Sequence, residues 1–321
     1  MKSKKLRIAV LYGGKSAEHD VSLKSAKNVI NALDKNKYEV TPIKIDKDGK
    51  INFTLNNIDL VFPVMHGPYG EDGSIQGFLK LANLPFVGSG VLGSAIGMDK
   101  DVTKRLLRDA GLPIGKFLVF ERKDEIHFDD VKKELGVPFF VKPANLGSSI
   151  GVSKVKNEAD FDQAVKSAFS YDAKIIIEEY TEGQEIECAV LGNENPIASI
   201  PGEIIPTHEF YDYEAKYIDA EGAKLKIPAG ISDAKIKEIQ ALAIKAFKVL
   251  CLEGMSRIDF FLTKSGKILI NEPNTIPGFT NISMYPKLWE KSGIAYPELI
   301  DRLIQLAIDR FKTQNKFRTT L

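Results

Sequence analysis

Hydrophobic positions along the first third of the chain follow two spacings. The short apolar runs LRIAVLYGG and IDLVFPVMHG predict buried strands, whereas residues 20–33 and the segment GSIQGFLKLAN repeat their apolar positions at helical spacing. Strands that alternate with helices are typical of a small α/β unit with a parallel sheet. Because ligands bind such units where strands end and loops begin, we expect residues 13–20 and 66–73 to contribute to a binding site.

The pattern changes near residue 101, where the elements become shorter. A helix pattern, VTKRLLRDAGLP, ends in Gly-Leu-Pro, and short strands and helices then alternate as far as IIIEEY. The remainder begins with strands, continues through a polar and aromatic loop at 206–224 and a helix at 232–250, and closes with a hairpin and further helices. We therefore predict three closely packed α/β domains, which are residues 1–100, 101–183 and 184–321.

A hairpin pattern over residues 257–284, RIDFFLTKSGKILINEPNTIPGFTNISM, places four polar side chains among apolar ones. If the Ser-Gly dipeptide forms a two-residue turn, Asp259 lies across from Glu272. The same pairing puts Arg257 across from Asn274, and all four side chains project from one face. Facing carboxylates repel unless positive charge lies between them, and Asp, Glu and Asn oxygens suit Mg²⁺ or Mn²⁺. The pattern predicts a metal site rather than a solvated edge with scattered charges.

Composition excludes several classes of protein. The 44 basic and 43 acidic residues give a net charge of +1, without the basic excess typical of proteins that bind nucleic acid or a membrane surface. The two cysteines, Cys188 and Cys251, lack metal-ligand spacing and are expected to be reduced thiols in a cytoplasmic protein. No run of roughly 18 apolar residues predicts a membrane span, and the apolar run near the start is too short for a signal peptide.

Three glycine patterns suggest nucleotide binding, and two of them fail. The Gly-Lys-Ser of residues 14–16 is no P-loop, because Ala9 stands where the first glycine is required. The G-x-G-x-x-G of residues 88–93 lacks an acidic residue at a strand end about 20 residues later, so we interpret it as a helix start, and a dinucleotide oxidoreductase remains a distant alternative. Residues 145–151 connect two strands and can fold their N–H groups over phosphates, although a plain flexible hairpin tip has the same pattern.

Charged residues around this last loop complete a candidate nucleotide site. Lys142 lies at the end of the strand before the loop, and Lys100 is a second cation that can reach phosphate oxygens. Downstream, IIIEEYTEGQE ends a buried strand with carboxylates and backbone groups that suit a ribose and a purine edge. Each charge alone is more typical of a solvated surface. Their order, from lysine through glycine loop and acidic segment to the hairpin, indicates a site for ATP and Mg²⁺.

These residues resemble the ATP-grasp superfamily and, within it, the D-alanine–D-alanine ligases, over roughly residues 6–310. The resemblance is carried by these motifs in this order: LYGGKSAEHDVS, HGPYGEDG, GMDK, VKPANLGSSIGVSKV, FYDYEAKY, RIDF and NEPNTIPGFTNISMYPKLW. It implies three α/β domains, with ATP between the central and C-terminal ones. It also implies an ATP-dependent ligase that joins two D-alanine molecules through a D-alanyl phosphate to supply peptidoglycan precursor synthesis.

Residue by residue, the resemblance implies how the cofactors are held. The lysines would contact phosphates and the others would lie in the glycine loop or around adenine and ribose: Lys100, Lys142, Lys216, Ser149, Glu178, Glu179, Thr181 through its backbone, and Glu185. Two Mg²⁺ ions, or Mn²⁺ in their place, would be bound by Asp259, Glu272 and Asn274, the acids and amide of the hairpin. Thr181 departs from the aliphatic residue that relatives often carry, which a backbone contact tolerates.

The first substrate site is implied at the start of the chain. Glu18 would bind the ammonium group of one D-alanine and form hydrogen bonds with Ser148 and Tyr217. His66 would line the pocket and is conceivable as a general base, although a lone histidine is as often structural. The glycine loop and the loop of residues 206–221 are the candidate covers that exclude water from an acyl phosphate.

The second substrate site is implied in the C-terminal part. Arg257 and the backbone N–H of Gly278 would form an oxyanion hole, and Ser283 would bind the carboxylate of the second D-alanine. Tyr217 favours D-alanine in this site, because relatives that use D-lactate lack that tyrosine. A ligase for D-lactate or D-serine and a catalytically silent nucleotide-binding regulator remain the alternatives. A homodimer is expected, with no nucleic-acid or membrane partner.

Overall fold

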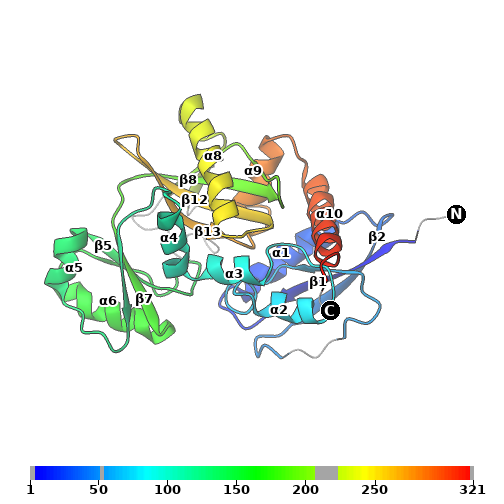
Figure 1. The fold of residues 1–321 in the computed structure, drawn as a ribbon, viewed down its shortest axis with the longest axis horizontal. Helices are drawn as coiled ribbons and strands as arrows, with labels where there is room; N and C mark the ends of the chain where they lie inside the picture. The colour runs from blue at the N-terminus through cyan, green and yellow to red at the C-terminus, as the bar shows by residue number, and fades with distance from the viewer. Residues whose placement is uncertain (1–3, 51–53, 207–222, 319–321) are drawn as a thin grey trace.

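The computed structural model describes residues 4–50, 54–206 and 223–318. Its strands form three sheets, each covered by helices, and Figure 1 shows how the three parts meet. No helix within these described ranges is long and apolar enough to cross a membrane.

The first sheet is parallel and has three strands in the order β2-β1-β3. Alternate residues of β1 face two different helical layers, because Ile8 and Val10 pack with α1 while Ala9 and Leu11 pack with α2. This burial on both sides explains the unbroken apolar run of β1, and it confirms the small parallel-sheet unit that the sequence predicts. The elements are β1 (Leu6–Gly13), α1 (His19–Ala32), β2 (Tyr38–Ile45), β3 (Leu60–Pro63), α2 (Ser74–Leu81) and α3 (Val91–Met98).

The second sheet is antiparallel, with its strands in the order β4-β7-β5-β6. Helices α5 and α6 pack on it through their own apolar cluster, in which Phe128, Phe139 and Phe161 contact one another edge to face or at a tilt. The elements are α4 (Lys100–Asp109), β4 (Phe117–Glu121), α5 (Phe128–Leu135), β5 (Phe139–Pro143), β6 (Ser153–Val155), α6 (Glu158–Tyr171) and β7 (Lys174–Glu179).

The third sheet has six strands, in the order β11-β10-β8-β12-β13 with β9 paired to β8, and all its pairings are antiparallel. Alternating residues of β8 again face two layers: Ile186 and Cys188 pack toward α8, and Ala189 and Leu191 pack toward α9 and α10. The elements are β8 (Gly183–Gly192), β9 (Ile197–Ala198), β10 (Gly202–Pro206), β11 (Ala223–Lys226), α8 (Asp233–Val249), β12 (Gly254–Thr263), β13 (Ile268–Asn274), α9 (Met284–Lys291) and α10 (Tyr296–Gln314).

The first and third parts share one apolar core, whereas the second has a core of its own. Phe62 of β3 and Phe279 belong to the same cluster as α9 and α10, and their rings meet edge to face at 6.0 Å. Arg310 of α10 adds a polar tie, because its guanidinium donates to the carbonyl oxygens of Phe86, at 2.7 Å, and of Gly88. These contacts fix the N-terminal part against the C-terminal part, which carries the β12–β13 hairpin.

The hairpin has the predicted pairing but not the predicted turn. Asp259 lies across from Glu272 and Arg257 across from Asn274. The turn, however, holds three residues and not two, because the Thr263 N–H bonds to the carbonyl oxygen of residue 267 and Gly266 takes the left-handed conformation at φ 80°. A β-bulge between the turn and the polar residues adds one residue on β13, which restores the predicted register.

The glycines of residues 88–93 begin a helix, as the sequence indicates. Gly90 is the N-cap of α3. A Cβ atom at Gly93 would lie 2.4 Å from the backbone oxygen of Cys251, so this glycine allows α3 to pack against the C-terminal part. Close helix packing therefore accounts for this glycine without a dinucleotide.

Candidate active site

Two adjoining cavities of about 450 Å³ and 420 Å³ form a cleft between the three parts. Lys100, Glu185, Glu272 and residues 146–148 line both cavities, so the two are continuous there. Every described residue to which the resemblance gives an individual role lines one cavity or both. Lys216, Tyr217 and the loop of residues 206–221, apart from Pro206 at its start, lie outside the described residues.

Four polar side chains of the hairpin face the first cavity together with the cations that balance them. The guanidinium of Arg257 makes two hydrogen bonds of 2.7 Å to Asp259 and lies 3.0 Å from a carboxylate oxygen of Glu187. The ammonium of Lys100 lies 3.5 Å from Glu272. The protein's own cations therefore supply positive charge beside both facing carboxylates. The pairing of Asp259 with Glu272 does not by itself require a metal ion, which corrects the argument drawn from the sequence.

The donor set nevertheless fits a hard divalent cation. An ionised carboxylate has several acceptor positions, so the bonds from Arg257 leave Asp259 with lone pairs for a metal. The amide of Asn274 lies beside that carboxylate, with its Nδ2 at 3.5 Å from Oδ2 of Asp259. Among the described residues, no group of three or more His, Cys, Asp or Glu side chains is placed to hold a metal. A metal at the hairpin would therefore take Asn274 as its third protein ligand, after Asp259 and Glu272.

Several lysines line the second cavity, and two of them share one carboxylate. Glu178 contacts Lys142 at 2.5 Å and Lys104 at 2.7 Å. Burial alone raises the pKa of Glu178, but the two lysines outweigh it and hold the pKa far below its usual range. Burial lowers the pKa of Lys142, but Glu178, Glu272 and Glu185 together raise it by more, so Lys142 stays charged. Glu178, which the resemblance places at adenine or ribose, is in this structure the partner of both lysines.

Lys104 was missed in the sequence, where its only sign is its position one helical turn after Lys100 on α4. The other predicted residues of this cavity lie around its rim. Glu179 accepts a hydrogen bond of 2.9 Å from the N–H of Lys116. Ser149 and Thr181 line the cavity wall. The ammonium of Lys154 sits 4.3 Å over the ring of Tyr180 at the same wall.

Glu18 and Ser148 join two loops across the first cavity. The hydroxyl of Ser148 donates to a carboxylate oxygen of Glu18, as the resemblance implies. Gly67 makes room for this carboxylate, because a Cβ atom there would lie 2.6 Å from Glu18 Oε2. Gly278 is close to Ser283 in the same way, because a Cβ atom at Gly278 would lie 2.6 Å from Ser283 Oγ. Glycines at these two positions let the backbone approach polar side chains that face the cavity.

His66 lines the first cavity, but both of its ring nitrogens have protein partners. Nδ1 lies 3.0 Å from the carbonyl oxygen of Ile276, which can only accept, so Nδ1 carries the proton. Nε2 then accepts from the hydroxyl of Ser25 at 3.1 Å. Burial lowers the pKa of His66, although the charge of Glu18 opposes this. The arrangement indicates a neutral histidine that holds two loops together rather than a general base.

Glu71 is a second residue that the sequence did not single out. Its carboxylate accepts hydrogen bonds from the N–H groups of Gly67, at 2.7 Å, and Ile276, at 2.9 Å. Burial, together with the charge of Glu18, raises the pKa of Glu71 to about 8. The only sign of Glu71 in the sequence is its place in the motif HGPYGEDG. The next residue of this motif, Asp72, has a different role, because it accepts hydrogen bonds from N–H groups near the start of α2.

Comparisons with known proteins agree with this geometry. The family model described as D-ala D-ala ligase C-terminus matches residues 106–305, and the one described as D-ala D-ala ligase N-terminus matches residues 7–56 and 50–89. The chain is 50% identical to the D-alanine–D-alanine ligase of Oceanobacillus iheyensis, over 98% of this chain and 99% of that protein. It is 48% identical to D-alanine–D-alanine ligase A of Escherichia coli strain K12, over 99% of this chain and 100% of that protein.

Solved structures give the same result. The D-alanine–D-alanine ligase from Coxiella burnetii is 42% identical, with a TM-score of 0.89 over 98% of this chain and 97% of that one. The VanG D-Ala:D-Ser ligase from Enterococcus faecalis is 36% identical, with a TM-score of 0.85 over 95% of this chain and all of that one. Since family models and full-length relatives match throughout, the chain belongs to the D-alanine–D-alanine ligase family, with the ATP-grasp fold that its sequence predicts.

Proposed function

We propose that the protein joins two D-alanine molecules, using ATP, through a D-alanyl phosphate. One observation carries this proposal: the hairpin with Asp259, Glu272 and Asn274 lies where a cavity lined by lysines meets a cavity with a buried carboxylate and hydroxyl groups. The first cavity suits a substrate with an ammonium and a carboxylate, and the second suits a nucleotide. Their junction is where a phosphoryl group would pass from one ligand to the other.

On the nucleotide side, Lys100, Lys142 and the glycine loop of residues 145–151 would hold the phosphates of ATP. Their charges oppose the negative charge that builds up on the transferring phosphoryl group. Asp259, Glu272 and Asn274 would hold Mg²⁺, which supplies electrostatic stabilisation of the phosphoryl oxygens when bound. Glu178 keeps Lys142 charged and directed along the cavity wall.

On the substrate side, Glu18 would bind the ammonium of the first D-alanine and Ser283 the carboxylate of the second. Arg257 and the N–H of Gly278 would stabilise the oxyanion of the tetrahedral intermediate. Arg257 is held by Asp259 and a neighbouring glutamate, so it is already ordered before the intermediate forms. A lost donor of this kind costs about 3–4 kcal/mol of transition-state stabilisation.

Phosphate release provides the direct test. Purified protein should release phosphate from ATP only when D-alanine and Mg²⁺ are both present, and mass spectrometry should find D-alanyl-D-alanine. L-alanine in place of D-alanine is the control, and equal turnover with it would reject the proposal. ATP binding without any turnover would instead favour a silent nucleotide-binding regulator.

The choice of the second substrate is a separate question, because the VanG protein among the solved relatives is a D-Ala:D-Ser ligase. We propose D-alanine on the basis of Tyr217, whose role stays a prediction. Product analysis with equal D-alanine, D-lactate and D-serine decides between them, and mainly depsipeptide or D-alanyl-D-serine would contradict us. Tyr217→Phe is expected to raise the share of D-lactate product, and an unchanged product ratio would remove Tyr217 as the determinant.

We further propose a cytoplasmic location, where ATP is available, and a homodimer as expected from the resemblance. Sedimentation velocity at micromolar concentration tests the second point. A monomer at all concentrations would contradict it.

A further inference from the structure

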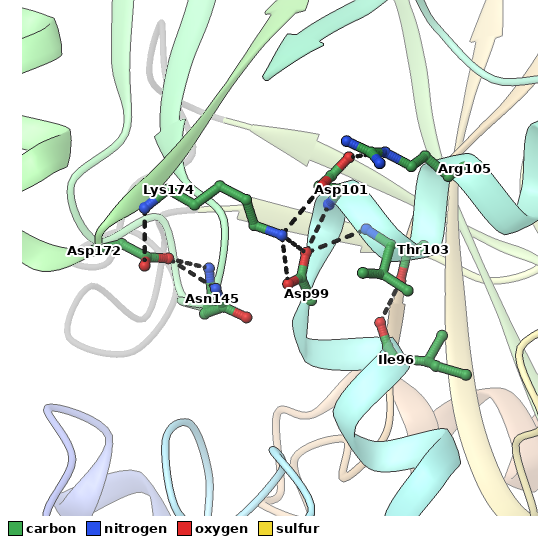
Figure 2. A network of polar contacts seen from close by, with 9 residues as sticks. Ile96, Asp99, Asp101, Thr103, Arg105, Asn145, Asp172 and Lys174 are labelled. Atoms are coloured by element: carbon green, nitrogen blue, oxygen red, sulfur yellow. Dashed lines mark hydrogen bonds and ion pairs between the residues drawn. The ribbon is translucent and has the colours of Figure 1, made fainter. Parts of the chain in front are cut away.

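A polar network outside the cleft joins the central sheet to helix α4 (Figure 2). It centres on Lys174, the first residue of β7, and on Asp99 and Asp101 at the start of α4. These side chains, and those of Asn145 and Asp172 beside them, do not line either cavity. Any effect of the network on the cleft must therefore pass through the residues that it holds.

The ammonium group of Lys174 is shared between two carboxylates. Its Nζ lies 2.9 and 2.7 Å from the two oxygens of Asp99 and 3.1 Å from Oδ2 of Asp101. Asp101 is 6% exposed and also accepts a hydrogen bond of 2.6 Å from Arg105. Burial lowers the pKa of Lys174, but the two aspartates raise this pKa by a larger amount. The pKa therefore lies above its usual value, and the lysine stays charged. In such a partly buried group of charges, removal of one partner leaves the others uncompensated.

On one side the network fixes the start of α4. Asp99 is the N-cap of this helix and accepts hydrogen bonds of 3.1 and 3.2 Å from N–H groups of the first turn. The next residue is Lys100, whose N–H donates to the carbonyl oxygen of Ala144 at 3.0 Å. The ammonium of Lys100 donates to the carbonyl oxygen of Leu146 at 2.5 Å and lies 3.5 Å from Glu272. A shift of Asp99 would therefore move Lys100.

On the other side the network fixes the start of the glycine loop. The carbonyl oxygen of Lys174 accepts the N–H of Ala144 at 3.0 Å. The N–H of Lys174 donates to Asp172 at 3.2 Å, and the other oxygen of Asp172 accepts the N–H and the side-chain amide of Asn145 at 2.8 and 3.0 Å. Asn145 is the first residue of the loop. The backbone of Lys174 therefore holds the start of the glycine loop, while its side chain holds the start of α4.

The two sides belong to differently packed bodies. Leu107 of α4 lies in the apolar cluster that α8 forms with the third sheet. Ile175 and Ile177, which follow Lys174 on β7, lie in the separate core of the central sheet. The ion pairs of Lys174 thus connect two cores at the point where Lys100 meets the glycine loop.

We propose that Lys174 is a positioning residue for phosphoryl transfer. Its bridge to Asp99 and Asp101 sets the position of Lys100 relative to the glycine loop, and so the alignment of the triphosphate. This inference rests on the proposed function, in which Lys100 and the loop bind ATP. Displacement of a reacting group by about 1 Å can cost on the order of a hundredfold in rate.

The test compares Lys174→Met with Lys174→Arg and Asp99→Asn in the full-length protein. Met removes the charge and keeps much of the side-chain length, whereas Arg keeps a charge that can still reach the carboxylates. Asn keeps the N-cap of α4, since Asn and Asp cap helices equally well, and removes the charge that pairs with Lys174. Lys37→Met is the control, because Lys37 pairs with Asp301 at 2.5 Å and neither residue lines a cavity.

We expect Lys174→Met to lower kcat/KM for ATP by roughly tenfold to a hundredfold, with the KM for D-alanine nearly unchanged. The melting temperature should fall as well, because the two aspartates lose the cation that they share. Lys174→Arg should recover most of the loss, and Lys37→Met should match the wild type. Asp99→Asn should cause a smaller loss of the same kind, and the double variant Asp99→Asn/Lys174→Met should be no worse than Lys174→Met alone. If Lys174→Met does not fold, the test uses Asp99→Asn and measures its affinity for a non-hydrolysable ATP analogue by isothermal titration. A weaker affinity than that of the wild type supports the proposal, and an equal affinity contradicts it.

Three results would overturn the inference. Kinetic constants of Lys174→Met equal to those of Lys37→Met would show that the bridge has no effect on the site. A melting temperature that falls while kcat/KM for ATP is kept would show a merely structural role. Equal increases of KM for ATP and for D-alanine would show general loosening. A wild-type protein without D-alanine-dependent turnover would instead reject the proposed function.

Discussion

Two buried glutamates on opposite sides of the cleft, Glu178 and Glu71, differ sharply in their electrostatics. Their exposed fractions are similar, at 6% and 8%. Glu178 contacts Lys104 and Lys142, and its pKa lies far below the usual range although burial alone raises it. The hydrogen bonds of Glu71 within the described residues come from neutral groups, and burial with the charge of Glu18 raises its pKa to about 8.

The difference indicates two tasks for a buried carboxyl group. Glu178 is an ionised partner for cations that must stay charged to bind phosphates. The raised pKa of Glu71 favours its protonated form, in which it ties Gly67 to Ile276 without adding a second negative charge beside Glu18. In the proposed reaction this leaves Glu18 as the charged carboxylate that binds the ammonium of the first substrate.

The largest effect is expected from Glu178→Gln. Without the carboxylate, Lys104 and Lys142 lose the counter-ion that they share, which should lower the free energy of unfolding by about 3–5 kcal/mol. Urea denaturation measures this loss. Glu182→Gln is the control, because its ion pair with Lys264 is exposed and should contribute nothing measurable. Equal stability of Glu178→Gln and the wild type would contradict the assigned role.

The second effect concerns the junction between the two sides. Glu272→Gln keeps the size of the side chain but removes the charge that Lys100 and the proposed metal share. We expect turnover to fall by about a hundredfold or more, with an unchanged circular dichroism spectrum and the Mg²⁺ dependence shifted to higher concentration. A near-normal rate would mean that Glu272 is not a metal ligand.

The smallest effect, taken over a single pH unit, is the change in stability with pH that Glu71 causes. Because its pKa is raised on folding from 4.5 to about 8, its stabilising protonation is complete below 4.5 and lost as the pH rises through 8. The unfolding free energy of the wild type should therefore fall relative to Glu71→Gln, by up to about 1.4 kcal/mol per pH unit in this interval. Urea denaturation at several pH values measures this difference. Parallel stability curves for the two proteins would show that Glu71 is already ionised when folded.

The hairpin shows how far the sequence could predict the site. Apolar positions such as Phe260 and Ile270 face a core, which fixes the face of each strand and therefore which polar residues meet. Turn length is determined more weakly, because a three-residue turn with a bulge gives the same pairing as a two-residue turn without one. The register was predicted correctly from an incorrect turn.

Glu71, Lys104 and Lys174 could not be identified in the same way. Glu71 meets a residue 205 positions away, and Lys174 meets Asp99 75 positions away. A charged residue near a glycine or in a helix is usually solvated, and nothing in its local pattern marks it as buried with a distant partner. Motif order predicted the candidate site, but only the packing of three sheets against one another revealed which charges support it.

The most direct test of the central claim is a crystal structure of the protein with an ATP analogue and Mn²⁺, with data collected at the manganese absorption edge. We predict anomalous density between the triphosphate and the side chains of Asp259, Glu272 and Asn274, with Lys100 and Lys142 on the phosphates. Manganese bound elsewhere, or a triphosphate with those carboxylates turned away from it, would contradict the account.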